Sequence, residues 1–231
     1  MATVTRSGTG VASGTDATTY TTGLTATTAD ALIVAFVYAT GQLQATPTFA
    51  SGSFTFSLLR RDGGTHSMYV FVSNSLDDGV SKAFTFTTTA NSTGCAYDVF
   101  SVTGMTRTGT SAIRQSNSSA VAASNTANTS FPSAPLTSNA CMVAVANATN
   151  PINSNQCTPT GWTNRVAKGY GTPATGYGVS SIDSGFTATL VQATNTSATA
   201  GRITIIELDT SAPASSVFPP VIMRSGGIIG A

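Results

Sequence analysis

The sequence predicts an all-β protein folded as an antiparallel β-sandwich. Hydrophobic and hydroxyl side chains alternate along several runs, and a period of two places them on opposite faces of a sheet. Glycine- and aspartate-rich turn signals separate these runs, and no long stretch has helical periodicity. The clearest alternating runs are 54–59, 68–72, 84–87 and 186–190, and the turn signals lie at 62–64, 74–75, 77–79 and 184–185.

The strand patterns occur twice in the same order, which indicates an internal repeat. Residues 31–37 resemble 140–146, 52–55 resemble 161–163, 69–72 resemble 177–180, 83–87 resemble 187–191, and 96–102 resemble 200–206. We therefore expect two similar five-stranded halves, at about 20–107 and 125–209.

A five-stranded sheet with one apolar face must cover that face. We expect the halves to pack face to face as one sandwich within residues 1–211, with two separate small barrels as the alternative. Residues 106–130 are rich in Ser, Asn, Ala and Thr and are interpreted as a long crossover or a linker between domains.

The chain is unusually poor in charge. Only 8% of its 231 residues are charged, and the net charge is +1. Ser, Thr and Asn must therefore supply most of the surface, which suits a protein held in an assembly or exposed outside a cell. A nucleic-acid partner would require a concentrated basic stripe, and the Lys and Arg residues are scattered.

The chain start lacks the apolar stretch of a signal peptide. The longest apolar run, Ala31–Ala39, is too short to span a bilayer. We expect synthesis in the cytoplasm, no membrane partner and no dependence on disulfides. Cys95, Cys141 and Cys157 have no metal-type spacing and are expected to be buried free thiols.

No pattern in the sequence predicts catalysis, a metal site or a cofactor. The one histidine, His66, follows a Gly-Gly turn and is interpreted as a surface residue. The adjacent pair Asp77–Asp78 is explained by turn chemistry, with a calcium site as a minor alternative. We therefore expect a protein that is not an enzyme. Glu207 and Asp209 are the other carboxylates close in sequence.

Charged residues inside strand patterns are unusual. Asp98 interrupts a strand, and its counterpart in the repeat is Arg202. A buried charge needs a partner, so we expect both to be interior or interface charges with partners.

The single tryptophan, Trp162, follows a Pro-x-Gly turn. With Tyr170 and Tyr177 it could form an aromatic platform on which a sugar stacks. The alternative is that Trp162 anchors the core of the second half.

The last residues differ from the rest of the chain. Residues 212–231 are apolar and rich in Pro and Gly, and the prolines oppose a regular helix or central strand. The segment is interpreted as an arm that docks on a neighbouring subunit, or as a tail packed on its own domain. The residues expected to form the arm are Phe218, Pro219, Pro220, Val221, Ile222, Met223, Ile228 and Ile229.

The succession of the strand Ala140–Ala146, a polar loop, Pro159–Thr163, Tyr177, a Thr-rich strand and a closing strand resembles the jelly-roll-type β modules of tailed-phage virion proteins. These modules occur in capsid decoration proteins, head fibres and tail proteins. The resemblance spans roughly residues 20–209 and has no catalytic residues to transfer. It implies a non-enzymatic virion component that forms homo-oligomers and contacts other virion proteins.

Two other functions are open from the sequence. One is a carbohydrate-binding module, on a virion or a cell surface, that recognises host glycans. The other is a hydrolase whose site is assembled from scattered carboxylates, which would need two of them in one cleft.

Overall fold

The computed structural model describes residues 1–52, 54–121, 126–148, 157–194 and 200–210. The strands of the first half are β1 (Thr3–Arg6), β2 (Val11–Ser13), β3 (Ala17–Thr21), β4 (Leu32–Thr40), β5 (Thr48–Ser51), β6 (Phe54–Gly63), β7 (His66–Ser73), β8 (Thr85–Ser92) and β9 (Gly94–Thr103). The second half contains the 3-10 turn η1 (Gly109–Ala112) and β10 (Ile113–Ala120), β11 (Thr126–Ser130), β12 (Cys141–Asn147), β13 (Thr163–Gly171), β14 (Ala174–Ile182), β15 (Leu190–Thr194) and β16 (Gly201–Leu208). All strand pairs are antiparallel, and the predicted all-β sandwich is confirmed.

The first half has the strand order of a jelly roll. One layer has the order β1-β9-β4-β7 and the other the order β3-β8-β5-β6. The long strand β6 pairs with both β5 and β7, so it joins the two layers into one curled sheet. Strand β2 pairs with β9 beyond the end of β1, as a continuation of that edge.

The second half repeats this order. Its larger sheet is β10-β16-β12-β14-β13, which matches β1-β9-β4-β7-β6, and the pair β11–β15 matches β3–β8. The expected crossover at 106–130 is therefore wrong, because it contains β10 and β11. Their sequences, IRQSNSSA and TANTS, are polar because both strands are only partly buried. Each half thus has more than the five strands expected.

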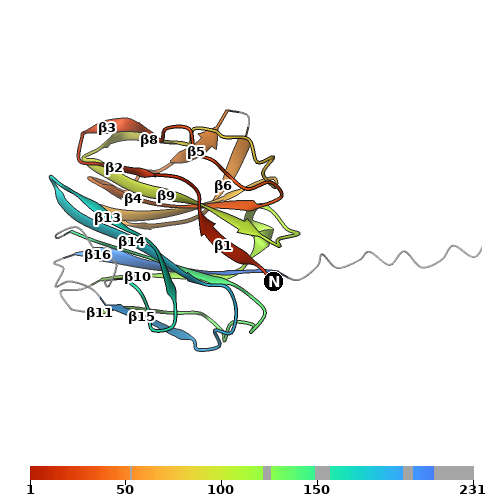
Figure 1. The fold of residues 1–231 in the computed structure, drawn as a ribbon. Coiled ribbons are helices and arrows are strands. Elements are labelled where there is room, and N and C mark those ends of the chain that lie inside the picture. Colours follow the sequence, from red (N-terminus) through yellow and green to blue (C-terminus); the bar gives the residue numbers. More distant parts are fainter. Residues whose placement is uncertain (53, 122–125, 149–156, 195–199, 211–231) are drawn as a thin grey trace, which may run out of the picture.

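The molecule has four layers (Figure 1). The β1-β9-β4-β7 layer and the β10-β16-β12-β14 layer face each other, and each is covered on its other side by the outer strands of its own half. The expected face-to-face packing of the halves is present. The expectation of a single two-layer sandwich is not, because each half also closes its own sandwich.

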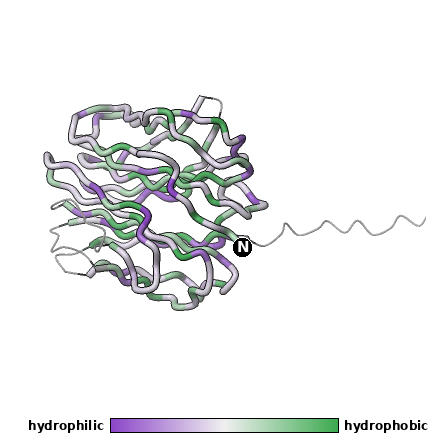
Figure 2. The backbone as a smooth tube through the Cα atoms, in the orientation of Figure 1, coloured by the Kyte–Doolittle hydropathy of each residue, from purple (hydrophilic) through white to green (hydrophobic). Residues whose placement is uncertain are grey.

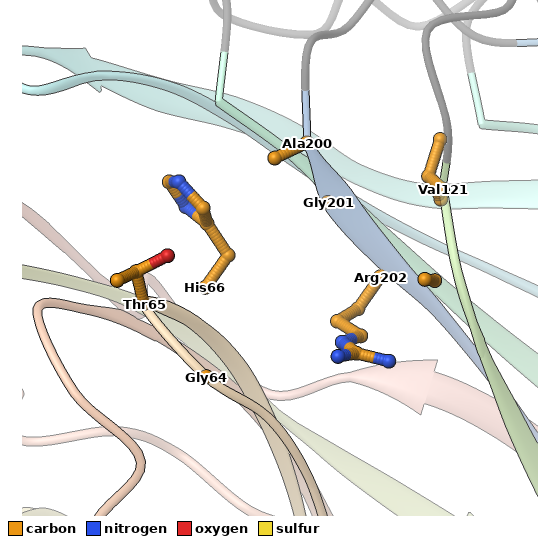
Figure 3. Close-up of a pocket in the computed structure, with 8 residues that line it drawn as sticks. Gly64, Thr65, His66, Val121, Ala200, Gly201 and Arg202 are labelled. Carbon is orange, nitrogen blue, oxygen red and sulfur yellow. The ribbon is translucent and has the colours of Figure 1, made fainter.

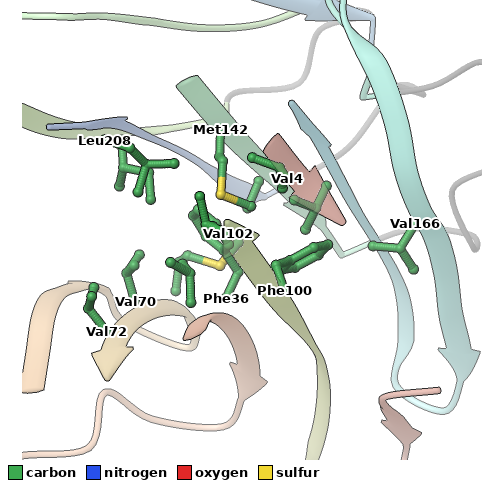
Figure 4. Close-up of a cluster of buried hydrophobic side chains, with 14 of the residues drawn as sticks. Val4, Phe36, Val70, Val72, Phe100, Val102, Met142, Val166 and Leu208 are labelled. Atoms are coloured by element: carbon green, nitrogen blue, oxygen red, sulfur yellow. The ribbon is translucent and has the colours of Figure 1, made fainter. Parts of the chain in front are cut away.

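Three hydrophobic cores fill the spaces between these layers. The inter-half core includes Phe36, Phe100, Met142 and Leu208 (Figure 4). The outer core of the first half is aromatic, with Phe49 stacked on Phe71 and Phe84 and in edge contact with Tyr97. The outer core of the second half contains Phe131, Val143, Trp162, Val191 and Ile205. The central strands are consequently buried on both faces: every residue of β4 and of β12 is buried.

The expected alignment of the repeat is wrong by one residue. Tyr69 packs in the outer core of the first half, whereas its expected counterpart Tyr177 packs in the inter-half core. The residues of β7 that share the face of Tyr177 are Met68, Val70 and Val72, so the neighbour of Tyr69 in sequence, Val70, takes that face. A slip of one residue moves a side chain to the opposite face of a strand. When both faces are apolar, the sequence pattern cannot detect that slip.

The surface reflects the low charge. Figure 2 shows hydrophobic stretches along the inner strands, whereas much of the outer chain has intermediate hydropathy and strongly hydrophilic segments are sparse. No helix within the described residues is both long and apolar enough to cross a bilayer.

Candidate functional site

The three aromatic residues predicted to stack on a glycan do not form a platform. Tyr177 is fully buried, and its hydroxyl donates to the Phe36 carbonyl oxygen at 2.8 Å across the inter-half core. Tyr170 is also buried there, with its hydroxyl 3.2 Å from Thr40 Oγ1. Trp162 belongs to a different core, where its ring contacts Phe186 edge to face at 5.1 Å. The prediction is wrong because the aromatic rings are used for packing. The alternative of a core tryptophan agrees with the structure.

The expected docking arm, residues 212–231, lies outside the described residues. Its docking on a neighbour stays a prediction.

Asp98 is the centre of a buried ion cluster that joins the halves. Its carboxylate is fully buried and accepts from Arg6 Nε at 2.8 Å and from the Gly10 backbone N–H at 3.2 Å. Lys168, from β13 of the other half, forms an ion pair with the second carboxylate oxygen and donates to the Tyr97 carbonyl oxygen at 2.7 Å. Burial lowers the pKa of the Lys168 ammonium group, while the charge of Asp98 opposes that shift. The expectation that Asp98 needs partners is therefore confirmed.

Local backbone geometry makes this cluster possible. Residues 7–10 separate β1 from β2 and leave the ladder opposite Asp98. A Cβ atom at Gly10 would lie 1.9 Å from the Tyr97 carbonyl oxygen, so only glycine allows the backbone to approach this closely.

Glu207 is a second buried carboxylate, and its hydrogen bonds hold parts of the fold together. Its oxygens accept from Arg114 Nη1 at 2.6 Å, Asn139 Nδ2 at 2.7 Å and the Leu136 backbone N–H at 2.9 Å. Its neighbour in sequence, Asp209, pairs with Arg107 at 3.6 Å. These contacts attach the loop before β12 to β16.

The turn at Asp77–Asp78 is held by Lys82, which pairs with both carboxylates. Within the described residues, no group of three His, Cys, Asp or Glu side chains is arranged to hold a metal. All three cysteines are buried and free, as expected, and burial raises the pKa of Cys141 and Cys157 to about 12.

His66, interpreted as a surface residue, is half-buried. Its Nδ1 lies 2.7 Å from the Tyr38 hydroxyl, and the two rings stack with centroids 6.1 Å apart. Burial lowers the pKa of His66, which favours the neutral imidazole. The residue begins β7, beside a hollow between the halves.

This hollow, which we name the inter-half cleft, has a volume of about 220 Å³. Its walls come from the β6–β7 turn of the first half and from the end of β10 and start of β16 in the second. In Figure 3, His66 and Thr65 stand on one side and Arg202 on the other. The lining residues are Gly64, Thr65, His66, Ala120, Val121, Ala200, Gly201 and Arg202.

Arg202 has an unusual environment. Within the described chain, its guanidinium forms no hydrogen bond or ion pair. The expectation of an interior partner is therefore not met for Arg202 within the described residues, whereas Asp98, its counterpart, is paired; a partner of Arg202 at an interface stays a prediction. The side chain lies instead at the inter-half cleft.

A second hollow of about 270 Å³ lies over Trp162, Phe186 and Leu190. The indole Nε1 of Trp162 is buried and has no hydrogen-bond partner among the residues that the structure describes. The inter-half cleft has more groups that could bind a ligand than this second hollow, because it combines a cation, an imidazole and a hydroxyl.

Sequence reasoning did not find the inter-half cleft. Arg202 and His66 are far apart in the chain, and they meet only because the two jelly rolls pack face to face. The one available signal was the position of Arg202 inside an apolar strand. No protein-family model, curated protein or solved structure shows a significant match to this chain.

Proposed function

We propose that this protein is a non-enzymatic structural component of a tailed-phage virion, either a capsid decoration or cement protein or a head-fibre or tail-associated protein. The observation that supports this most is the tandem jelly roll. Double-sheet jelly rolls are a frequent architecture of viral shell proteins. A fold alone does not define a function, so the proposal also needs support from the surface.

The charge distribution gives that support. The few charges are largely used within the molecule: Asp98, Glu207 and Asp77 are buried and paired. Soluble proteins that stay apart usually rely on free surface charge. A neutral surface of hydroxyl and amide groups suits lasting contact with copies of the same chain and with other virion proteins.

Assembly through the C-terminal arm can be tested by the mass of the protein in solution. We would compare the full chain, of 23.3 kDa, with a chain that ends at Ala212. The shorter chain keeps every strand described here. We expect an oligomer for the full chain and a monomer for the shorter one.

A matched control separates the length of the arm from its apolar character. The full-length double variant Ile228→Asp/Ile229→Asp keeps the length, and we expect it to behave as the shorter chain does. A monomeric full chain would refute self-assembly through the arm. An oligomer that persists without residues 213–231 would assign assembly to the sandwich surfaces.

The alternative proposal, a carbohydrate-binding module for host glycans, no longer has an aromatic platform. The observation that keeps it open is the inter-half cleft, where Arg202 has no ion pair or hydrogen bond with the described part of the chain.

A further inference from the structure

The inter-half cleft contains a cation that the described chain does not neutralise. Every other Lys and Arg in the described residues has an acceptor. These side chains pair with a carboxylate, except for Arg61, whose guanidinium donates to the carbonyl oxygens of Gln44 and Ala45. The guanidinium of Arg202 is the exception, although it is only partly exposed.

The sheet explains why Arg202 has no side-chain acceptor directly opposite it on the adjacent strands. Its partners on the adjacent strands are Ala120 of β10 and Ala146 of β12. Alanine side chains provide space but no acceptor. The planar guanidinium therefore keeps its donors available, in a fork that matches two adjacent oxygens of one ligand.

The opposite wall supplies neutral polar groups. His66 uses Nδ1 for the Tyr38 hydroxyl, which leaves Nε2 for another partner. When the Tyr38 hydroxyl donates to Nδ1, Nε2 carries the ring proton and can donate. Thr65 adds an exposed side chain beside it (Figure 3). No carboxylate lines the cleft, so an anion there would meet no like charge from the lining residues.

The size of the cleft limits the ligand. A volume of about 220 Å³ is below the roughly 300–1,000 Å³ of pockets that hold drug-sized ligands, which favours a small solute. Small residues line the rest of the space: Gly64, Ala120, Ala200 and Gly201. A single ring with one acidic group suits this volume.

We propose that the inter-half cleft binds a small organic carboxylate, with the acidic group on Arg202 and a hydroxyl-bearing ring beside His66 and Thr65. A hexuronic acid is a ligand of this class. The proposal goes beyond the structural role suggested above and does not depend on it. A virion protein and a protein of another kind could both have this site.

The experiment uses the full chain and a set of simple probes. His66 is the only histidine, so its imidazole Hε1 gives a single signal that can be assigned in NMR without ambiguity. We would titrate with glucuronate, acetate, glucose and inorganic phosphate at constant pH and ionic strength. We expect glucuronate to shift the His66 signal with saturation, acetate to act more weakly, and glucose to have no effect.

Variants assign the effect to Arg202. We expect Arg202→Gln to weaken glucuronate binding at least about tenfold, which is the factor that 1.4 kcal/mol produces. Arg202→Lys keeps the charge but loses the forked geometry of the guanidinium, and its affinity for glucuronate should lie between that of the unchanged protein and that of Arg202→Gln. Arg61→Gln is the control, because it removes the same charge from an arginine whose acceptors are carbonyl oxygens outside the cleft.

Each outcome has a defined meaning. Saturable glucuronate binding that Arg202→Gln removes and Arg61→Gln preserves would support the site. Absence of any shift with either carboxylate, or equal affinity in Arg202→Gln, would overturn it. Binding of phosphate without binding of carboxylates would overturn the proposed ligand class. If Arg202→Gln does not fold, as shown by its thermal unfolding, Arg202→Lys alone decides between these outcomes.

Discussion

The buried ion cluster around Asp98 should make a large contribution to the stability of the packed halves. We would replace Asp98 by Asn, which keeps the size of the side chain and removes its charge. Arg6 is 33% exposed and can turn toward water. Lys168 is only 16% exposed, and it would keep only the Tyr97 carbonyl oxygen and a contact of 5.7 Å to the Tyr177 ring.

The magnitude follows from the charge that is left behind. Removal of one partner of a buried ion pair costs about 3–5 kcal/mol, because the other charge stays desolvated. For a slope of about 3 kcal/mol/M in urea, a loss of about 3 kcal/mol lowers the midpoint by about 1 M. Lys168→Met should cost less, because Asp98 keeps Arg6 and the Gly10 N–H.

A double-mutant cycle in urea isolates the pair. We expect Asp98→Asn/Lys168→Met to be about 2–3 kcal/mol more stable than the sum of the single losses predicts. Circular dichroism follows both halves, and fluorescence of the single tryptophan, Trp162, follows the second. Coincident transitions would show that the halves unfold together.

Asp62→Asn is the matched control, because its ion pair with Arg60 is about a quarter exposed. Such pairs contribute about 0–1 kcal/mol. If Asp98→Asn cost no more than Asp62→Asn, or if the effects of Asp98 and Lys168 were additive, the reasoning about the buried cluster would be wrong.

Three further predictions concern the other buried groups. In Glu207→Gln, the loss of the charged acceptor shared by Leu136 N–H and Asn139 should lower the free energy of unfolding by about 2–3 kcal/mol, measured in urea. Burial raises the pKa of all six tyrosines, so the folded chain holds protons that the unfolded chain releases near pH 10. The contribution of these tyrosines to the free energy of unfolding should therefore be fully present below that pH and fall above it. Tyrosinate absorbance should appear together with unfolding. Lys168 acts in the opposite direction, since its lowered pKa favours folding as pH rises, but it is one group against six. The three cysteines should not react with a thiol reagent at pH 8 in the folded chain and should all react after unfolding, because the thiolate is the reactive form and burial raises the pKa of each thiol.

These predictions have clear contrary results. A neutral Glu207→Gln variant would show that the loop before β12 does not depend on the carboxylate. Tyrosine ionisation near pH 10 without loss of the fold would contradict the burial of the hydroxyls. Rapid modification of one thiol would show that its surroundings open readily.

Part of the fold was readable from local patterns. The alternation in 54–59 and 84–87 predicted strands, and β6 and β8 occupy those positions. The polar strands β10 and β11 were missed because Ser, Asn and Thr at half-exposed edges resemble a loop. Only pairing with β16 and β15 makes them strands.

The candidate site was less predictable. Trp162, Tyr170 and Tyr177 have the composition of a sugar platform, yet burial is a property of the packed layers and not of the residue type. The contact of His66 with Tyr38 was not predictable for the same reason, because Tyr38 lies beside it only after β4 and β7 pair.

The sequence by itself determined that the chain is all-β, that it contains a repeat, and that Asp98 had to find partners, because strand period, turn chemistry and the cost of a buried charge are local properties. The tertiary structure alone decided that each half closes its own jelly roll, which face each aromatic side chain takes, and that Arg202 meets His66 across the inter-half cleft. Strands that are apolar on both faces carry no pattern that distinguishes one face from the other, so only the packing of the layers decides which core each side chain enters.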